Sequence, residues 1–284
     1  MKGLRLRFPR FRRAISPVIA TVFLMGIIVA AIGAVLTIIY PNLQTIDDQV
    51  AINQTSSYLE ALDDAVRSLV IQAEGTEKLV NLRSNGGTIM GDKVSSMTII
   101  PFMNGTDMSS FLTTEVYSRL VIQNPLSSNL YSAYEHQYLR GSSDQDFFVH
   151  NETTISTSPW TVLNVSRPSE YAILNSSLSY RMQVTNSFTS GNSIETTLSL
   201  VQFTFPGELF RSLTSSNVRM KFLGVTETTI FKNLYNTYAG NIKLSVITTL
   251  TGNSPHLDVP LKFAGSSFFW SLSLKLYTLE VTFE

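Results

Sequence analysis

The sequence predicts an α+β protein, in which one long N-terminal helix, hydrophobic and then amphipathic, precedes a predominantly antiparallel β-sandwich domain. Residues 18–39 form an uncharged apolar run, apolar residues then recur at three-four spacing as far as Gln72, and from about Lys78 the apolar pattern alternates with a period of two. The 284 residues include no cysteine, which excludes disulfides and cysteine-based metal sites or nucleophiles. The fold must therefore be held together by its core, without covalent cross-links.

The charges are unevenly distributed along the chain. Six of the 21 basic residues lie in the first 13 positions, where there is no acid: Lys2, Arg5, Arg7, Arg10, Arg12 and Arg13. Subtracting these six from the 21 leaves 15 basic residues against 21 acidic ones. This acidic excess argues against nucleic acid as a partner, and the start of the chain, residues 1–14, is predicted to be a positively charged leader.

The apolar run is long enough to cross a membrane. The 22 residues from Val18 to Ile39 carry no charge, and their only polar side chains are Thr21 and Thr37. At about 1.5 Å per residue, a helix of this run measures about 33 Å, whereas the hydrocarbon core of a bilayer is about 30 Å thick. The basic residues before it, and Asp47 and Asp48 after it, predict a single span with a cytoplasmic N-terminus and an extracellular C-terminal domain.

The residues just before the apolar run indicate how the leader is removed. An ordinary secretory signal has a shorter apolar region, with its cleavage site after that region. Here the small residue Ala14 precedes the apolar run. Arg13-Ala14-Ile15-Ser16, followed by Pro-Val-Ile-Ala-Thr, resembles the class III signal of archaeal type IV pilin-like proteins over about 30 residues. The resemblance implies that a prepilin peptidase cleaves between Ala14 and Ile15.

The resemblance also implies a function. The chain would be a structural subunit, minor or adhesive, of an archaeal type IV pilus-like cell-surface filament, with other pilin-like subunits as partners. Residues 15–74 would be the transmembrane and stalk helix, and residues 75–284 the extracellular β domain. Ile19 stands where bacterial pilins usually carry a glutamate, and archaeal relatives commonly lack that glutamate. The alternative is a single-pass membrane anchor that displays an extracellular binding domain of the cell envelope, and neither function needs a cofactor.

Small residues form a candidate packing stripe within the apolar run. They are Gly26, Ala30, Gly33 and Ala34. Such stripes let apolar helices approach closely, as in the core of a filament, but glycine and alanine are also common in any membrane helix. At the start of the helix, Ser16 can cap it and Pro17 suits its first turn.

Beyond Pro41 the spacing predicts an amphipathic helix that packs on the chain's own β domain or on neighbouring subunits. Its predicted apolar stripe consists of Leu43, Ile46, Val50, Leu59, Leu62, Val66 and Leu69. The acids Glu60, Asp63 and Asp64 are expected to lie off this stripe. Pro41 is expected to kink or end the helix, because it removes a backbone donor and crowds the preceding turn.

Segments rich in Val, Ile, Thr, Phe and Tyr predict the strands of the β domain. They are residues 78–83, 97–102, 116–122, 178–184, 196–205, 218–225, 241–250 and 268–283. Because no helical pattern separates them, an antiparallel sandwich is expected. A polar segment near residues 150–168 leaves two options, one large sandwich or two β subdomains. In the last strand, the alternation of apolar and polar residues shifts by one position near Tyr277, which indicates a bulge. The run Phe268-Phe269-Trp270 in the same strand is either an exposed adhesive patch or a run that straddles two packed faces.

The exterior offers few groups for catalysis, so no enzyme activity and no metal site are predicted. The three histidines, His136, His150 and His256, have no metal-ligand spacing, and Asp144 and Asp146 lack the later ligands of a calcium loop. A surface hydrolase that uses His136 or Asp144 is a third alternative. Five Asn-x-Ser/Thr sequons are candidate N-glycosylation sites: Asn53, Asn104, Asn151, Asn164 and Asn175.

Overall fold

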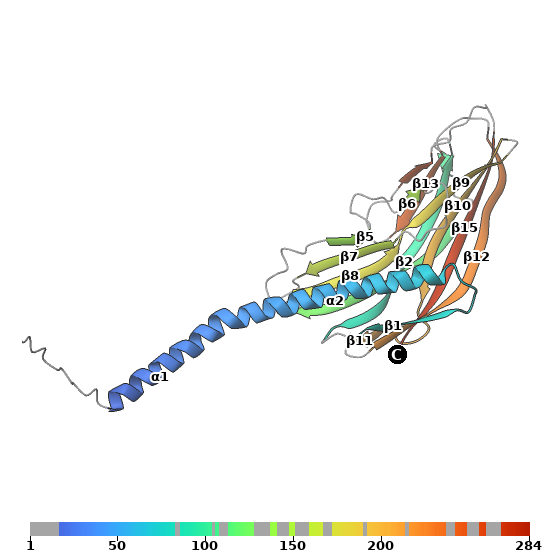
Figure 1. Ribbon diagram of the computed structural model, residues 1–284. Coiled ribbons are helices and arrows are strands. Elements are labelled where there is room, and N and C mark those ends of the chain that lie inside the picture. The colour runs from blue at the N-terminus through green and yellow to red at the C-terminus, as the bar shows by residue number, and fades with distance from the viewer. Residues whose placement is uncertain are drawn as a thin grey trace, which may run out of the picture. The chain divides into compact units, whose positions relative to one another are not determined.

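The structure, a computed structural model, confirms the α+β layout, with one long N-terminal helix followed by a mostly β domain with antiparallel sheets (Figure 1). It describes residues 17–82, 86–103, 106–107, 113–127, 137–140, 148–150, 159–166, 172–189, 192–213, 216–236, 242–248, 256–259 and 268–284. The predicted cleavage site, Arg13 to Ser16, lies outside these residues.

Three consecutive segments make up the helical part, namely α1 (Pro17–Ala34), the π-helical turn η1 (Val35–Ile39) and α2 (Tyr40–Leu69). The Tyr40 N–H donates to the Val35 carbonyl, five residues earlier, as a π turn requires. The chain stays helical through Pro41, so this proline does not end the helix. The wider π turn ends two residues before Pro41, which lacks an N–H, and it forms the turn that the proline ring would crowd.

Residues Asp48–Glu284 form one compact unit that includes two β-sheets and residues 48–69 of α2. Sheet A has the strand order β1-β12-β15-β10-β9-β6. These strands are β1 (Glu77–Leu82), β12 (Ser216–Asn236), β15 (Phe268–Phe283), β10 (Ser193–Thr204), β9 (Met182–Thr189) and β6 (Phe148–His150). The β10–β15 and β6–β9 pairs are parallel, and the other described pairs are antiparallel.

Sheet B has the order β14-β13-β2-β4-β8-β7-β5, with β3 and β11 paired to β2. Its strands are β14 (His256–Val259), β13 (Ile242–Thr248), β2 (Thr88–Met103), β4 (Thr113–Leu126), β8 (Ala172–Tyr180), β7 (Pro159–Ser166), β5 (Gln137–Arg140), β3 (Thr106–Asp107) and β11 (Phe210–Ser212). Each sheet combines strands from both sides of residues 150–168. This is the arrangement of a single β domain, one of the two options that the sequence leaves open.

One predicted strand, residues 178–184, is divided between the two sheets. Its first residues end β8 in sheet B, and its last residues begin β9 in sheet A, with Arg181 between them. A continuous alternating pattern does not show where a chain leaves one sheet for the other, because both strands keep the same period of two.

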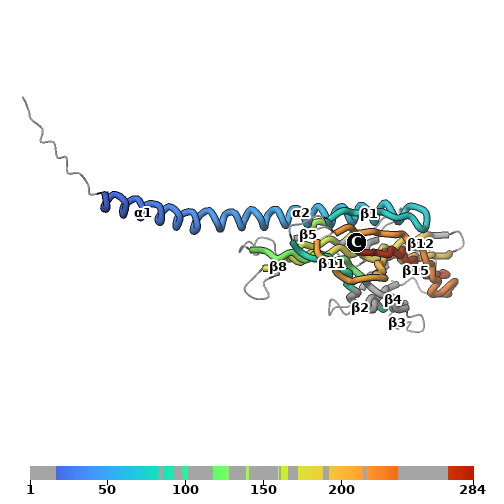
Figure 2. Tube along the Cα trace, turned by 90° about the horizontal axis from the view of Figure 1, so that it is seen from below, coloured from blue at the N-terminus to red at the C-terminus, as the bar shows by residue number. Residues whose placement is uncertain are grey.

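Residues 48–69 of α2 pack on the sheets (Figures 1 and 2). Its buried side consists of Asp48, Ile52, Thr55, Leu59, Leu62, Asp63, Ala65, Val66 and Leu69. The predicted single stripe is therefore wrong, because Leu43, Ile46 and Val50 are exposed. At about 100° per residue these three lie on the side of α2 opposite to the buried one. The placement of Asp63 off the stripe is also wrong, since its side chain is fully buried, whereas Glu60 and Asp64 are exposed.

Strand β15 changes its buried face halfway along its length. Trp270, Leu272 and Leu274 are buried on one face, and Leu279 and Val281 on the other, while the pairing of β15 with β10 has no register shift. The slip in the alternation near Tyr277 is therefore not a bulge in β15. The bulge lies opposite, in β12, where Leu223 is the extra residue between Phe222 and Gly224. Gly224 has a φ of 126°, a conformation that suits glycine at a bulge.

Gly91 in β2 lies against the ring of Phe205. A Cβ atom at Gly91 would come within 2.4 Å of that ring. Gly91→Ala is therefore expected to lower the free energy of unfolding by about 1–3 kcal/mol through overpacking. Urea unfolding of the full chain in detergent measures the loss, and adding Phe205→Leu should recover part of it. Gly207→Ala is the matched control, since its Cβ would meet nothing within 4 Å. An equal loss in both glycine variants would contradict the packing argument.

Candidate functional site

The most conspicuous surface of the described chain is the apolar side of the N-terminal helix. The helix Pro17–Leu69 is long and apolar enough to cross a membrane by length and composition, and none of its most apolar stretch is buried by the described residues. Large apolar side chains such as Phe23, Met25 and Leu36 are more than half exposed to solvent. Soluble monomers rarely expose so large an apolar surface. No described part of the chain covers this surface, which suits a lipid or protein environment.

The two polar side chains in this apolar run are satisfied within the helix. Thr21 Oγ1 donates to the Val18 carbonyl at 2.8 Å, and Thr37 Oγ1 donates to the Gly33 carbonyl at 2.8 Å. A hydroxyl that hydrogen-bonds to its own helix is the usual solution where no water is present. Neither threonine therefore opposes burial of the helix in an apolar environment.

The predicted packing residues all lie in α1. They are Gly26, Ala30, Gly33 and Ala34. Neither Gly26 nor Gly33 would bring a Cβ atom within 4 Å of another group. The small-residue stripe is thus open for contact with another molecule, and no part of the described chain uses it.

A row of buried polar contacts joins α2 to sheet B. At its start, Asp48 accepts hydrogen bonds from the Ser127 backbone N–H at 2.9 Å and from the Ser127 hydroxyl at 3.2 Å. Two turns later, the Thr55 hydroxyl accepts a hydrogen bond from Asn124 Nδ2 at 2.6 Å. Asp48 and Thr55 are both almost fully buried. Because each contact is directional, the row fixes both the rotation of α2 and its position along its own axis.

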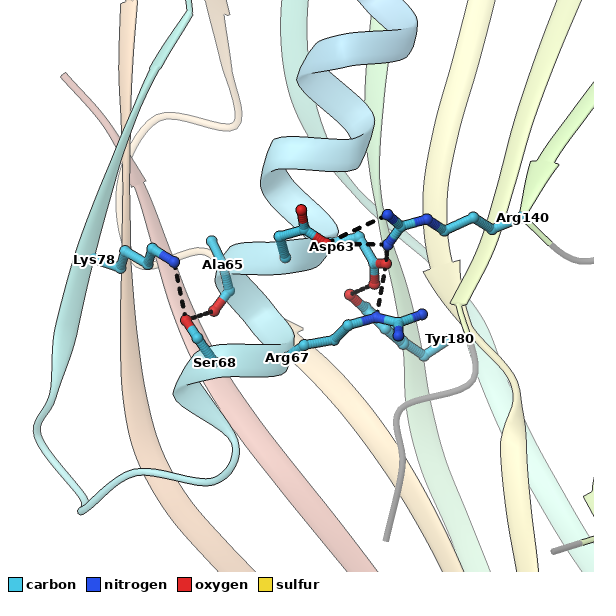
Figure 3. Close-up of polar contacts among 8 residues, drawn as sticks. Asp63, Ala65, Arg67, Ser68, Lys78, Arg140 and Tyr180 are labelled. Atoms are coloured by element: carbon cyan, nitrogen blue, oxygen red, sulfur yellow. Dashed lines mark hydrogen bonds and ion pairs between the residues drawn. The ribbon is translucent and has the colours of Figure 1, made fainter. Parts of the chain in front are cut away.

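The row ends in an ion-pair cluster around Asp63, shown in Figure 3. Tyr180 OH of β8 donates to Asp63 Oδ1 at 2.8 Å, and Arg67 Nε donates to Oδ2 at 2.9 Å. Arg140 of β5 also donates to Oδ2, and it contacts Asp64 at 3.3 Å. Burial raises the pKa of Tyr180, against the opposing effect of the two guanidinium groups, so this hydroxyl stays protonated and remains a donor. Asp63 is thus a buried carboxylate with both oxygens paired.

The other flank of α2 is held by a smaller set of contacts. Lys78 Nζ of β1 donates to the Ser68 hydroxyl at 3.0 Å, and that hydroxyl donates to the Ala65 carbonyl at 2.8 Å (Figure 3). The C-terminal end of α2 is therefore held from both sides, by β5 and β8 of sheet B and by β1 of sheet A. Sequence reasoning missed this site. The one local signal for it was Arg67, placed one helical turn after Asp63.

The candidate glycosylation sites fall into three groups. Asn53 is exposed on α2. Asn164 and Asn175 are half-buried, and they lie directly opposite each other in the β7–β8 pair. Cross-strand neighbours have Cβ atoms about 5 Å apart, too close for two bulky glycans side by side. Asn104 and Asn151 lie outside the described residues.

The residues considered for metal binding or hydrolysis are not brought together in the described part of the chain. His150 lies in β6 of sheet A and His256 in β14 of sheet B, whereas His136, Asp144 and Asp146 lie outside the described residues. Among the described side chains, no group of three or more His, Asp or Glu residues is placed to hold a metal ion.

The aromatic run in β15 places side chains on both faces of sheet A. Phe268 and Trp270 are buried, while Phe269 points to the opposite face and is 40% exposed. Trp270 Nε1 donates to Thr196 Oγ1 at 2.9 Å, and its ring packs edge-on against Phe231 at a centroid distance of 4.7 Å. The run straddles two faces, and only one of its three rings is available at the surface.

Comparisons with protein-family models, with curated proteins and with solved structures find no match to this chain.

Proposed function

We propose that the protein is a subunit of an archaeal type IV pilus-like filament, made as a membrane-inserted precursor. The carrying observation is the uninterrupted helix Pro17–Leu69, which is apolar and exposed in its first part and built into the core of the β domain in its second. A filament subunit of this kind polymerises through its helix and displays an outer domain. Its helix therefore needs an exposed apolar part for polymerisation and a second part that is packed into the outer domain.

Several features fit this proposal. The π turn keeps the helix continuous through Pro41, and the two threonines of the apolar run bond within the helix. The open small-residue stripe around Gly26 and Gly33 would let neighbouring helices approach closely in a filament core. In the membrane the same helix would be a single span, with its N-terminus in the cytoplasm and the β domain outside. The partners are then a prepilin peptidase before assembly and other pilin-like subunits after it.

N-terminal processing is the first test. In a host that has a prepilin peptidase, the mature chain is expected to begin at Ile15, and Arg13→Asp is expected to abolish this cleavage because it alters the residue before Ala14. Mass spectrometry of the N-terminal peptide measures both results. Arg5→Asp is the matched control, since it removes the same charge from the leader at a distance from the site.

Two further outcomes decide between a filament and an anchor. Retention of residues 1–14 by the wild-type chain would contradict the proposal and favour a single-pass anchor that displays a binding domain. For a processed chain, a filament subunit is expected in the material sheared from the cell surface, whereas an anchor stays with the membrane fraction.

A further inference from the structure

One face of sheet A carries hydroxyl side chains in register across four strands. Thr185 of β9, Thr197 of β10, Ser273 of β15 and Thr229 of β12 lie opposite one another in successive strand pairs. The Thr197 and Ser273 hydroxyls are 3.3 Å apart, and the Thr185 hydroxyl donates to the Thr197 carbonyl at 3.3 Å. The four strands lie side by side in Figure 1. A transverse row of hydroxyl groups therefore crosses this part of the sheet.

The pattern continues two residues further along the strands. Ser187 of β9, Glu195 of β10 and Ser271 of β15 form the adjacent row on the same face, because side chains two residues apart in a strand point the same way. We call the six hydroxyl-bearing residues of these two rows the hydroxyl face: Thr185, Ser187, Thr197, Thr229, Ser271 and Ser273. The Ser271 hydroxyl also accepts a hydrogen bond from the Asn233 backbone N–H of β12 at 3.0 Å. Each hydroxyl has one donor and two acceptor positions, so the positions of the face that these contacts do not use can serve a ligand.

An exposed aromatic pair borders the hydroxyl face. In the next row along the strands, Phe269 of β15 lies opposite Tyr235 of β12. Their ring centroids are 5.3 Å apart, with the planes tilted by 51°, and the residues are 40% and 57% exposed. Both rings lie on a sheet whose opposite face is fixed by buried Trp270 and Phe231. The pair is therefore an exposed apolar surface beside a polar one.

The charges on this side of the sheet are few and largely balanced. Lys275 Nζ lies 3.4 Å from the Glu227 carboxylate in the row on the other side of the hydroxyl face. Glu195 is the remaining charged residue in the two hydroxyl rows. A surface without a cationic excess does not suit nucleic acid or another polyanion. A ligand that matches it is uncharged, rich in hydroxyl groups, and able to present a C–H face to an aromatic ring.

We propose that the hydroxyl face and the Tyr235–Phe269 pair bind an uncharged polysaccharide. Sugar rings have the required chemistry, because their C–H groups pack on the negative face of an aromatic ring while their hydroxyls exchange hydrogen bonds with Ser and Thr. One sugar ring stacks on the aromatic pair, and the following sugars lie over the hydroxyl rows. The site does not depend on the proposed filament, because the face belongs to the β domain of the unprocessed chain as well.

Binding to defined polysaccharides tests this proposal. The probes are microcrystalline cellulose, chitin and a mannan gel, mixed with the full chain in a detergent that has no sugar headgroup. At least one of them is expected to retain the protein and to release it when soluble oligosaccharide of the same sugar is added. Tyr235→Ala and Phe269→Ala are each expected to weaken retention by about tenfold or more, as removal of an aromatic contact at a binding site does. Tyr235→Phe keeps the ring and should bind close to the wild-type level.

Phe210→Ala is the matched control. Phe210 is 66% exposed on β11, outside sheet A, so its loss should leave retention unchanged. Failure of all three polysaccharides to retain the wild-type chain would overturn the proposal. An equal loss of retention in Phe210→Ala and Phe269→Ala would also overturn it. Retention that soluble oligosaccharide does not reverse would do the same, because each of these results indicates general adsorption of apolar groups.

Discussion

Replacing Asp63 with alanine is expected to lower the free energy of unfolding by about 3–5 kcal/mol. The Asp63 side chain has no solvent exposure, and it accepts hydrogen bonds from Tyr180, Arg67 and Arg140. Removing it leaves the Tyr180 hydroxyl and two guanidinium groups without their shared acceptor at the helix–sheet contact. Urea unfolding of the full chain in detergent, followed by circular dichroism of the β domain, measures the change.

Asp64→Ala is the control for this prediction. Asp64 also contacts Arg140, at 3.3 Å, but its side chain is 64% exposed. An exposed ion pair contributes about 0–1 kcal/mol, so this variant should remain close to wild type. Equal losses in the two variants would show that Asp63 acts through net charge alone and that its buried hydrogen bonds contribute nothing. A double-mutant cycle between Asp63→Ala and Tyr180→Phe then isolates the contact between these two side chains.

Trp270→Ala is expected to have a similarly large effect, with a loss of about 3–5 kcal/mol in the free energy of unfolding. Trp270 is fully buried, packs on Phe231 and donates a hydrogen bond to Thr196. The substitution opens a cavity and also removes the N–H that donates to the buried Thr196 hydroxyl, which keeps only its hydrogen bond to Asn186. The same urea unfolding experiment measures the loss.

The neighbouring residue supplies the matched control. Phe269→Ala removes a ring from the same strand, but from its exposed face. Its contact with Tyr235 is an aromatic pair of the kind that contributes about 0.5–1.5 kcal/mol, so this variant should remain folded. If Phe269→Ala destabilised the chain as much as Trp270→Ala, the assignment of the two faces of β15 would be wrong.

The fold class follows from periodicity in the sequence, because the apolar run, the three-four spacing and the alternating strands each reflect one local geometry. The same local argument fails for α2. Leu43, Ile46 and Val50 recur at three-four spacing, as do Leu59 and Leu62. Val50 and Leu59 are nine residues apart, about 180° around a helix, so the two groups lie on opposite faces, and only the second group is buried. Spacing defines a face but does not tell which face meets the domain.

The buried cluster around Asp63 could not be predicted in the same way. Its partners Arg140 and Tyr180 lie 77 and 117 residues away in the sequence. An acid in a helix is normally exposed, and it becomes a core residue only where folding brings donors to both of its oxygens. The hydroxyl face has a similar origin, because Ser and Thr in alternating strands acquire a common surface only once the strand register is known.

The position of β15 in sheet A has a consequence for biosynthesis. This strand is made after all the other described strands, yet it lies between β12 and β10 in the interior of the sheet. At about 5–20 residues per second, the roughly 200 residues between the end of α2 and the start of β15 take about 10–40 s to translate. During that interval the apolar helix is already available for membrane insertion, while Leu59 and Leu62 still lack part of their core. The nascent domain must therefore remain incomplete, and be protected from aggregation, until β15 is made.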